Sequence, residues 1–347
     1  MKLWRVGARH EPGSAAGGEP EFGNAGRVGD SDGISGPHLH GEGVHSHPAP
    51  HPHGGRSSGP PVVGIVGAGP VGTALGVAIS RAGWPVTAVA SRDAARRERF
   101  RDLVPGVRTF VEPEAILDEV ELAILAVPDD AIAAVAAPMR LYGGQALVHT
   151  SGLLGAEVLE PALGAGSHAG AFHPLVSFTS DVELSVAGMK GATIALEGDD
   201  VILRLLVDLA EAIGGVAVRL PKGTKPAYHA AAVMASGGFV ALLDAIVTLG
   251  AAAGIDEGGS LAIYGRLIEQ TLANARAIGV GAALTGPVAR GDAGTLAAHL
   301  ETLERLAPGT LELYLAAARR ELHIVEERRS LSAERLEQLR AALAKAT

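Results

Sequence analysis

The stretch V-V-G-I-V-G-A-G-P-V-G, residues 62–72, decides the fold of this chain. A β-branched run ends in the pattern Gly67-x-Gly69-x-x-Gly72, and small residues with helical spacing follow to Ala82. Glycine is required for a tight turn at the first position, for the close approach of a pyrophosphate at the second, and for helix–strand packing at the third. The stretch therefore predicts a dinucleotide-binding turn. The alternative is a glycine-rich turn that binds no nucleotide.

Beyond this turn, strand and helix patterns alternate through residues 61–222, which predicts an α/β, Rossmann-like, doubly wound parallel sheet. The expected strands cover residues 62–66, 86–90, 108–111, 122–126, 146–149, 169–172, 193–196 and 216–220. Only helical patterns follow, so residues 223–347 are expected to form an all-α C-terminal domain. Its first helix, Pro226–Ala253, is apolar on nearly all sides, so we expect it at the centre of a bundle or in a dimer interface.

Residues 1–60 have a different composition, rich in Gly, Pro, Ser and His and without a sustained apolar period. Such a segment cannot bury enough surface to offset its chain entropy, so we expect a disordered tail. Six histidines between residues 38 and 53 can bind Zn²⁺ or Ni²⁺ weakly. The alternative for this tract is a solubilising tail with biased composition.

Composition excludes several classes of function. The formal net charge is −9 and aromatic residues make up only 3% of the 347 residues, which disfavours nucleic acid as a partner. The absence of cysteine rules out disulfides and thiolate metal sites, and we expect no metal site in the globular part. No signal-peptide pattern is present, and the most apolar stretch, residues 230–243, is shorter than a bilayer requires. We therefore expect a cytoplasmic protein without membrane association, from a bacterium to judge by the Ala, Gly, Arg and Val content.

The expected cofactor is NADP. Ligands of such sheets bind at the carboxyl ends of the strands, where the second strand ends in Ser91-Arg92. A hydroxyl and a guanidinium suit a 2′-phosphate, whereas an acid at this place would hold the ribose diol of NAD. Because Asp93 is an acid close to this strand end, NAD stays the alternative cofactor. The residues expected to contact the cofactor are Gly67, Ala68, Gly69, Val71, Gly72, Ser91, Arg92, Val127 and Pro128.

The acid–base candidates lie at further strand ends and at the start of the first C-terminal helix. His149 and His173 end two further strands, and the pKa of an unperturbed imidazole lies near neutrality. Lys225, His229 and Ser236 share one face of the first C-terminal helix, where a lysine and a hydrogen-bonding side chain can orient a carbonyl or imine. The structural alternatives are a satisfied core histidine at 149 and a helix start with a snorkelling lysine at 225.

Three residues are expected to contact the substrate. Ser151 follows a strand that should face the nicotinamide, and Ser236 lies on the same helix face as Lys225. Arg290 lies in a polar loop and can bind a carboxylate in bidentate fashion. Asp292, two residues later, is expected to cap the next helix.

Taken in order, these segments resemble the bacterial Rossmann-like and domain-of-unknown-function 2520 (DUF2520) family of NADP-binding oxidoreductases. The resemblance implies homodimers that form through the helical domain. The layout is also similar, more distantly, to pyrroline-5-carboxylate reductase, prephenate dehydrogenase and the 3-hydroxyacid dehydrogenases. The last group uses a lysine followed one turn later by asparagine; Lys225 matches the lysine, and His229 stands at the place of the asparagine. The segments that carry the resemblance are the glycine turn, Ser91-Arg92, Val127-Pro128-Asp129, residues 149–152, 172–175, 228–232 and 285–292.

Three functional hypotheses follow. The first is an NAD(P)-dependent oxidoreductase that transfers hydride to or from a small keto, hydroxy or imino compound bearing a carboxylate. The second is a non-catalytic dinucleotide sensor or scaffold, favoured by the missing Lys/Asn pair and by Pro70 and Gly237, which replace polar groups of the family pattern. The third is a metal-handling protein that acts through its histidine-rich tail.

Overall fold

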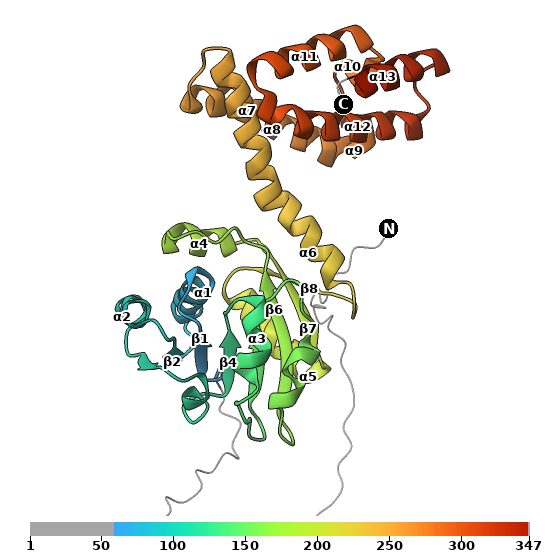
Figure 1. The fold of residues 1–347 in the computed structure, drawn as a ribbon. Helices are drawn as coiled ribbons and strands as arrows, with labels where there is room; N and C mark the ends of the chain where they lie inside the picture. The colour runs from blue at the N-terminus through green and yellow to red at the C-terminus, as the bar shows by residue number, and fades with distance from the viewer. Residues whose placement is uncertain (1–58, 346–347) are drawn as a thin grey trace, which may run out of the picture. The chain divides into compact units, whose positions relative to one another are not determined.

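The computed structural model describes residues 59–345, which divide into two compact units after Tyr228 (Figure 1). The sequence placed the domain boundary at 222/223, shortly before this division. The tail expected at residues 1–60, with its histidines, lies almost entirely outside the described residues.

The first unit is built on an eight-stranded sheet of order β3-β2-β1-β4-β5-β6-β7-β8. Six strands, β1 to β6, run parallel, and the chain reverses its winding direction between β1 and β4. This doubly wound arrangement confirms the fold predicted from the sequence. The strands are β1 (Val63–Val66), β2 (Val86–Ala90), β3 (Arg108–Phe110), β4 (Leu122–Leu125), β5 (Ala146–His149), β6 (His168–Pro174), β7 (Thr193–Gly198) and β8 (Val216–Arg219).

The expectation of a wholly parallel sheet was wrong for its last two strands. β7 pairs antiparallel with β6, and β8 pairs parallel with β7. The connection from β6 to β7 contains α4 (Val182–Met189), which packs beside α1 (Pro70–Arg81) on the same face of the sheet (Figure 1). Because this connection does not cross to the far end of the sheet, as a right-handed parallel crossover must, the chain returns in the opposite direction.

Helices cover both faces of the sheet and enclose two apolar cores. One core includes Phe100, Phe172 and Leu75; the other includes Leu125, Leu147 and Met139, and all six side chains are fully buried. The remaining helices of the unit are α2 (Ala94–Leu103), the 3₁₀ turn η1 (Pro113–Ile116), α3 (Asp129–Ala136), the 3₁₀ segment η2 (Ala156–Ala162) and α5 (Asp200–Ala212).

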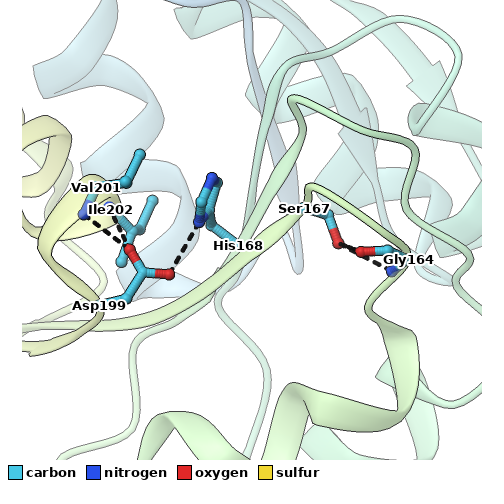
Figure 2. A network of polar contacts seen from close by, with 6 residues as sticks. All are labelled: Gly164, Ser167, His168, Asp199, Val201 and Ile202. Carbon is cyan, nitrogen blue, oxygen red and sulfur yellow. Dashed lines mark hydrogen bonds and ion pairs between the residues drawn. The ribbon is translucent and has the colours of Figure 1, made fainter.

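Asp199 shows how helix starts are fixed in this unit (Figure 2). Its carboxylate accepts from the backbone N–H groups of Val201 and Ile202 at 2.8 and 3.0 Å, which caps α5. Its other oxygen lies 2.8 Å from Nδ1 of His168, at the first residue of β6. Although partial burial opposes ionisation, these hydrogen bonds keep the pKa of Asp199 below its ordinary value. One side chain therefore joins α5 to the neighbouring strand.

The second unit is helical, as expected, and its core forms among α10 to α13, around Leu296, Leu315 and Leu339. The segment 279–291, which includes the polar loop expected at Arg290, contains two short helices. The elements after β8 are α6 (Lys225–Val233), the π-turn η3 (Met234–Gly238), α7 (Phe239–Ala252), α8 (Glu257–Ile278), α9 (Val280–Ala283), α10 (Pro287–Arg290), α11 (Ala293–Leu306), the 3₁₀ turn η4 (Pro308–Thr310), α12 (Leu311–Arg328) and α13 (Ala333–Lys345).

The helical segment Lys225–Ala252 is more extensive than the apolar stretch counted from the sequence. Among the described residues it is the one segment that is long and apolar enough to cross a membrane, by length and composition alone. Most of its residues are exposed in the single chain, including Met234 and Val240 at 76% and 62% of their surface. The expectation that this segment is buried in a bundle is therefore wrong within the single chain, and burial in a dimer stays a prediction.

Candidate functional site

A cavity of about 840 Å³ lies at the carboxyl ends of β1, β2 and β4 in the first unit. This is the edge of the sheet, next to the point where the winding reverses, at which open α/β sheets bind their ligands. Eight of the residues expected to contact a cofactor line it: Gly67, Ala68, Gly69, Val71, Ser91, Arg92, Val127 and Pro128. The ninth, Gly72, lies immediately behind the turn.

Steric requirements divide the three glycines into two kinds. Gly67 has φ = +102°, and a Cβ there would lie 2.3 Å from the carbonyl oxygen of Ala126. A Cβ at Gly72 would lie 1.9 Å from the carbonyl oxygen of Gly67. At Gly69, by contrast, a Cβ would meet only the Arg96 guanidinium, at 4.0 Å. The protein itself thus requires two of the glycines, whereas the third leaves open space in the cavity.

The start of α1 suits an anion. Gly69 is its N-cap residue and makes no side-chain cap, and Pro70 occupies the first turn, where its missing N–H costs nothing. The first-turn N–H groups of Val71 and Gly72 therefore lack a side-chain acceptor, at the positive end of a 12-residue helix. Together with the bare backbone at Gly69, this arrangement fits the diphosphate of a dinucleotide.

Charged residues surround the end of the cavity near β2. Arg92 and Arg96 both line it, and Arg96 reaches over the glycine turn. Arg97 is turned away, because its guanidinium donates to the backbone carbonyl of Ser91. Asp93 caps α2 by accepting from the Arg96 N–H at 3.1 Å and pairs with the Arg96 guanidinium at 3.4 Å. The acid that left NAD open is thus engaged with the start of its own helix.

Glu112 and Glu114 also line the cavity and were missed from the sequence. They come from the segment after β3, a short turn without any motif. Thr150, which follows β5 and belongs to the segment 149–152 that was singled out from the sequence, lines the cavity too and donates to the carbonyl oxygen of Leu125 at 3.3 Å.

His149 lies in the core, fully buried. Its Nδ1 accepts from the N–H of Ser151 at 3.2 Å, so its Nε2 carries the proton and donates to the carbonyl oxygen of Gly155 at 3.0 Å. Burial, and secondarily the positive charge of Lys225, lowers its pKa to about 4. This geometry matches the satisfied core histidine that the sequence left as the alternative, and we leave His149 out of the proposed chemistry.

Ser151 is buried and links three elements. Its Oγ donates to Asp129 Oδ2 at 2.7 Å and accepts from the N–H groups of Leu153 and Leu154 at 3.0 and 2.9 Å. Its carbonyl oxygen accepts from Nζ of Lys225 at 2.7 Å. The hydroxyl that was expected to contact substrate is therefore occupied within the protein.

Lys225 is 3% exposed, which is unusual for a lysine. Burial lowers its pKa to about 8, although the carboxylates of Glu197, Asp129 and Glu157 act in the opposite direction. A lysine in this state holds a proton at neutral pH and releases it readily, which suits an acid that serves a carbonyl or imine. Lys225 is therefore not the snorkelling lysine that was considered as the alternative.

A histidine–tyrosine contact lies on the same unit. The rings of His173 on β6 and Tyr228 on α6 meet edge to face, 5.8 Å apart at 84°. Burial raises the pKa of Tyr228. Tyr228, three residues after Lys225, was given no role from the sequence, and its buried phenol was visible only once the helix was in place.

The remaining candidates belong to the second unit. His229 follows Tyr228 on α6, and Ser236 lies in the π-turn, where its Oγ donates to the Ala232 carbonyl at 2.9 Å. Arg290 ends α10 with an exposed side chain. Asp292 caps α11 through Thr295, as expected. The roles of His229, Ser236 and Arg290 stay predictions. No group of residues suited to a metal ion occurs within residues 59–345.

Comparison with known proteins agrees with this architecture. Residues 50–174 match the family model described as a Rossmann-like domain, and residues 192–321 match the domain of unknown function DUF2520. The chain thus carries the two domains that its motifs indicated. No curated protein matches it.

Solved structures with the same fold include three that cover most of this chain. Protein TM1727 of Thermotoga maritima is 28% identical, with a TM-score of 0.56 and coverage of 77% of this chain and 99% of the other. A 1-pyrroline-5-carboxylate reductase of Streptococcus pyogenes is 16% identical (TM-score 0.52, coverage 82% and 98%). A reductive aminase of Aspergillus terreus, solved in complex with NADPH and ethyl-5-oxohexanoate, is 18% identical (TM-score 0.52, coverage 83% and 94%). The expected resemblance to pyrroline-5-carboxylate reductase is thereby confirmed at the level of the fold.

Proposed function

We propose that this protein is an NADP(H)-dependent oxidoreductase that acts on a small keto, hydroxy or imino compound carrying a carboxylate. The observation that carries the proposal is the cavity at the switch point, with open space at Gly69 beside an uncapped helix start and two arginines. Two structures of the same fold support it, one named for reduction of a carboxylate-bearing imine and the other solved with NADPH.

The chain's own residues divide the work of binding. The N–H groups at the start of α1 would hold the diphosphate, and Arg92 and Ser91 would hold the 2′-phosphate. Val127 and Pro128 would lie beneath the nicotinamide ribose, as expected from the sequence. Bound NADPH would supply a hydride, two electrons with one hydrogen, to the carbon of a C=N or C=O bond.

Lys225 supplies the matching proton in this proposal. The nitrogen or oxygen of the reduced bond gains one proton as its carbon gains the hydride. The proposed donor is the buried Lys225 ammonium, which is protonated at neutral pH. His173, His229 and Arg290 keep their predicted roles as second acid–base candidates and carboxylate anchor. In the reverse direction the neutral amine of Lys225 would take the proton back.

A Gly69→Val variant of the full chain tests the proposal. Because a Cβ at this position meets no protein atom closer than 4.0 Å, the variant should fold normally while its side chain occupies the place of the diphosphate. We expect saturable NADPH binding to the native protein by nicotinamide fluorescence, and a loss of about 100-fold or more in the variant, since the close backbone approach is blocked.

Gly258→Val, on the exposed first turn of α8, is the matched control and should bind NADPH normally. If the native protein binds neither NADPH nor NADH, the proposal fails. If it binds NADPH but oxidises none with pooled keto acids and cyclic imines, the sensor or scaffold hypothesis replaces it.

A further inference from the structure

Asp129 has a second role besides starting a helix. It is the first residue of α3. Pro128 is the N-cap residue, and Oδ2 of Asp129 accepts a hydrogen bond from the Ser151 hydroxyl, with 2.7 Å between the two oxygens. The side chain therefore ties α3 to the turn that follows β5.

That turn is fixed from several sides by Ser151. The Ser151 oxygen accepts two backbone N–H groups while it donates to Asp129, so the hydroxyl is fully used. The Ser151 N–H donates to the locked His149 ring. With these contacts in place, the one group of Ser151 that remains, its carbonyl oxygen, faces the Lys225 ammonium at 2.7 Å.

We propose that Asp129 is a positioning residue for Lys225, acting through Ser151 to hold a carbonyl oxygen on the lysine ammonium. The importance of this for turnover rests on the role proposed for Lys225 above. The contacts themselves do not depend on it.

Charge supports the same assignment. Negative charges act on Lys225 from three elements: Asp129 on α3, Glu157 on η2 and Glu197 on β7. His149 on β5 is neutral at physiological pH and does not oppose them. Asp129 therefore stabilises the ammonium form in two ways, by its charge and by the orientation of the Ser151 carbonyl.

The test follows Lys225 directly by NMR of the full chain labelled with [¹³C]lysine. The chain contains only five lysines, at positions 2, 190, 222, 225 and 345, so a Lys225→Arg sample identifies the Lys225 signal by its disappearance. We expect a titration midpoint near 8 in the native protein. Asp129→Asn should lower it by about 0.5 pH unit or more, because a stabilising charge is lost.

Asp130→Asn is the matched control. It removes a charge from the same helix turn, but Asp130 is exposed and does not contact Ser151. Its Lys225 midpoint should equal that of the native protein. If Asp129→Asn and Asp130→Asn give the same midpoint, the proposal is overturned.

Amide hydrogen exchange provides the second readout, which separates positioning from charge alone. Exchange at Leu153 and Leu154 should accelerate about tenfold or more in both Asp129→Asn and Ser151→Ala, because the hydroxyl that accepts these amides is loosened or lost. Unchanged exchange in both variants contradicts a positioning role. Should Asp129→Asn fail to fold, Ser151→Ala alone decides by the same criterion. None of these measurements needs a cofactor or substrate, so their failure is distinct from failure of the proposed function.

Discussion

At the scale of single residues, the burial of the Lys225 ammonium lowers the stability of the folded protein. The pKa of Lys225 falls from 10.5 in the unfolded chain to about 8 in the folded protein. This shift destabilises the folded protein most strongly below pH 8, because the ammonium must there stay charged while it is buried. The opposition fades as the pH rises from 8 to 10.5, because the unfolded chain then still binds a proton that the folded protein has released. The cost at pH 7 is about 3 kcal/mol.

Replacing Lys225 with Met should therefore stabilise the protein while it abolishes reduction. We expect the free energy of unfolding in urea to rise by about 2 kcal/mol at pH 7, the relief of burial less the hydrogen bond lost at Ser151. Above about pH 10.5 the relief of burial is gone and only the lost hydrogen bond remains, so the variant should there be less stable than the native protein by about 1 kcal/mol. Lys222→Met, three residues earlier on an exposed loop, is the control and should change neither quantity.

The pH dependence of activity gives a separate prediction. If the Lys225 ammonium donates the proton, kcat/KM for NADPH-dependent reduction should fall as the pH rises through about 8. Oxidation in the reverse direction should rise over the same interval, because it needs the neutral amine. A profile that stays flat from pH 7 to pH 9 would remove Lys225 from proton transfer.

The preference for NADPH over NADH is a further prediction that concerns a single residue, Arg92. Arg92 lines the cavity, and the nearby acid, Asp93, is already engaged with α2. Arg92→Ala should weaken NADPH binding by about tenfold or more and leave NADH within about twofold, since only the former carries the 2′-phosphate. Arg99→Ala on α2, whose side chain donates to the carbonyl oxygen of Ser180 outside the cavity, is the control. An equal loss for both cofactors would show that Arg92 contacts a part they share.

At this scale the sequence predicted most of the residues that line the cavity, but not the surroundings of the proposed reacting groups. Glycine turns and strand ends report backbone geometry, and backbone geometry follows from local pattern. Whether Ser151 is free to react depends on the contacts it makes with Asp129 and Lys225, which lie 22 and 74 residues away in the chain. No local pattern contains that information.

At the scale of elements, α1 and α2 meet at a position where only glycine fits. A Cβ at Gly76 would lie 2.3 Å from Cζ of Phe100, a ring that is fully buried. The small-residue pattern of α1 was visible in the sequence, but its partner was not, because α2 reads as a charged helix with few apolar residues. Phe100 is the buried side chain of that helix.

A Gly76→Ala variant should test this contact. Despite the better helix propensity of alanine, overpacking against Phe100 should lower the free energy of unfolding by about 1–3 kcal/mol. Gly258→Ala, where a Cβ meets only ordinary contact with Asp256, should gain about 0.5 kcal/mol instead. Chemical denaturation of both variants measures the difference; equal stabilities would mean that the Phe100 ring moves aside at little cost.

The direction of strands was harder to predict than their existence. All eight strands occur near their expected residues, yet β7 and β8 run against the other six. Periodicity shows where a strand lies but not which way it runs. Direction depends on the path of the connecting segment, and α4, which determines that path after β6, was not anticipated.

At the scale of the whole molecule, the exposed apolar residues of the helical unit call for a partner. Ile263 and Leu267, one turn apart on α8, expose 56% and 59% of their surfaces, and Val240 on α7 exposes 62%. Soluble single chains rarely leave such residues gathered on neighbouring helices. We propose a second copy of this chain as the partner, in line with the family resemblance.

Light scattering on the full chain checks the homodimer. We expect the native protein to have twice the mass of one chain, and Ile263→Asp with Leu267→Asp to give the monomer, because two buried carboxylates would lose their hydration. Leu306→Asp, a partly exposed leucine at the end of α11, should stay dimeric. A native monomer that partitions into detergent or vesicles would point to the apolar segment Lys225–Ala252 as a membrane element instead.

The protein requires glycine at positions 67 and 72 for steric reasons but not at position 69, and this difference can be used in living cells. A cell that carries valine at position 69 would contain a folded protein at its normal abundance, with its surfaces and assembly intact, that no longer responds to pyridine nucleotides. Metabolites that accumulate or vanish in such a cell, but not in one lacking the gene altogether, would separate the consequences of redox turnover from those of physical presence. The unknown substrate can thus be sought by genetics before any compound is assayed.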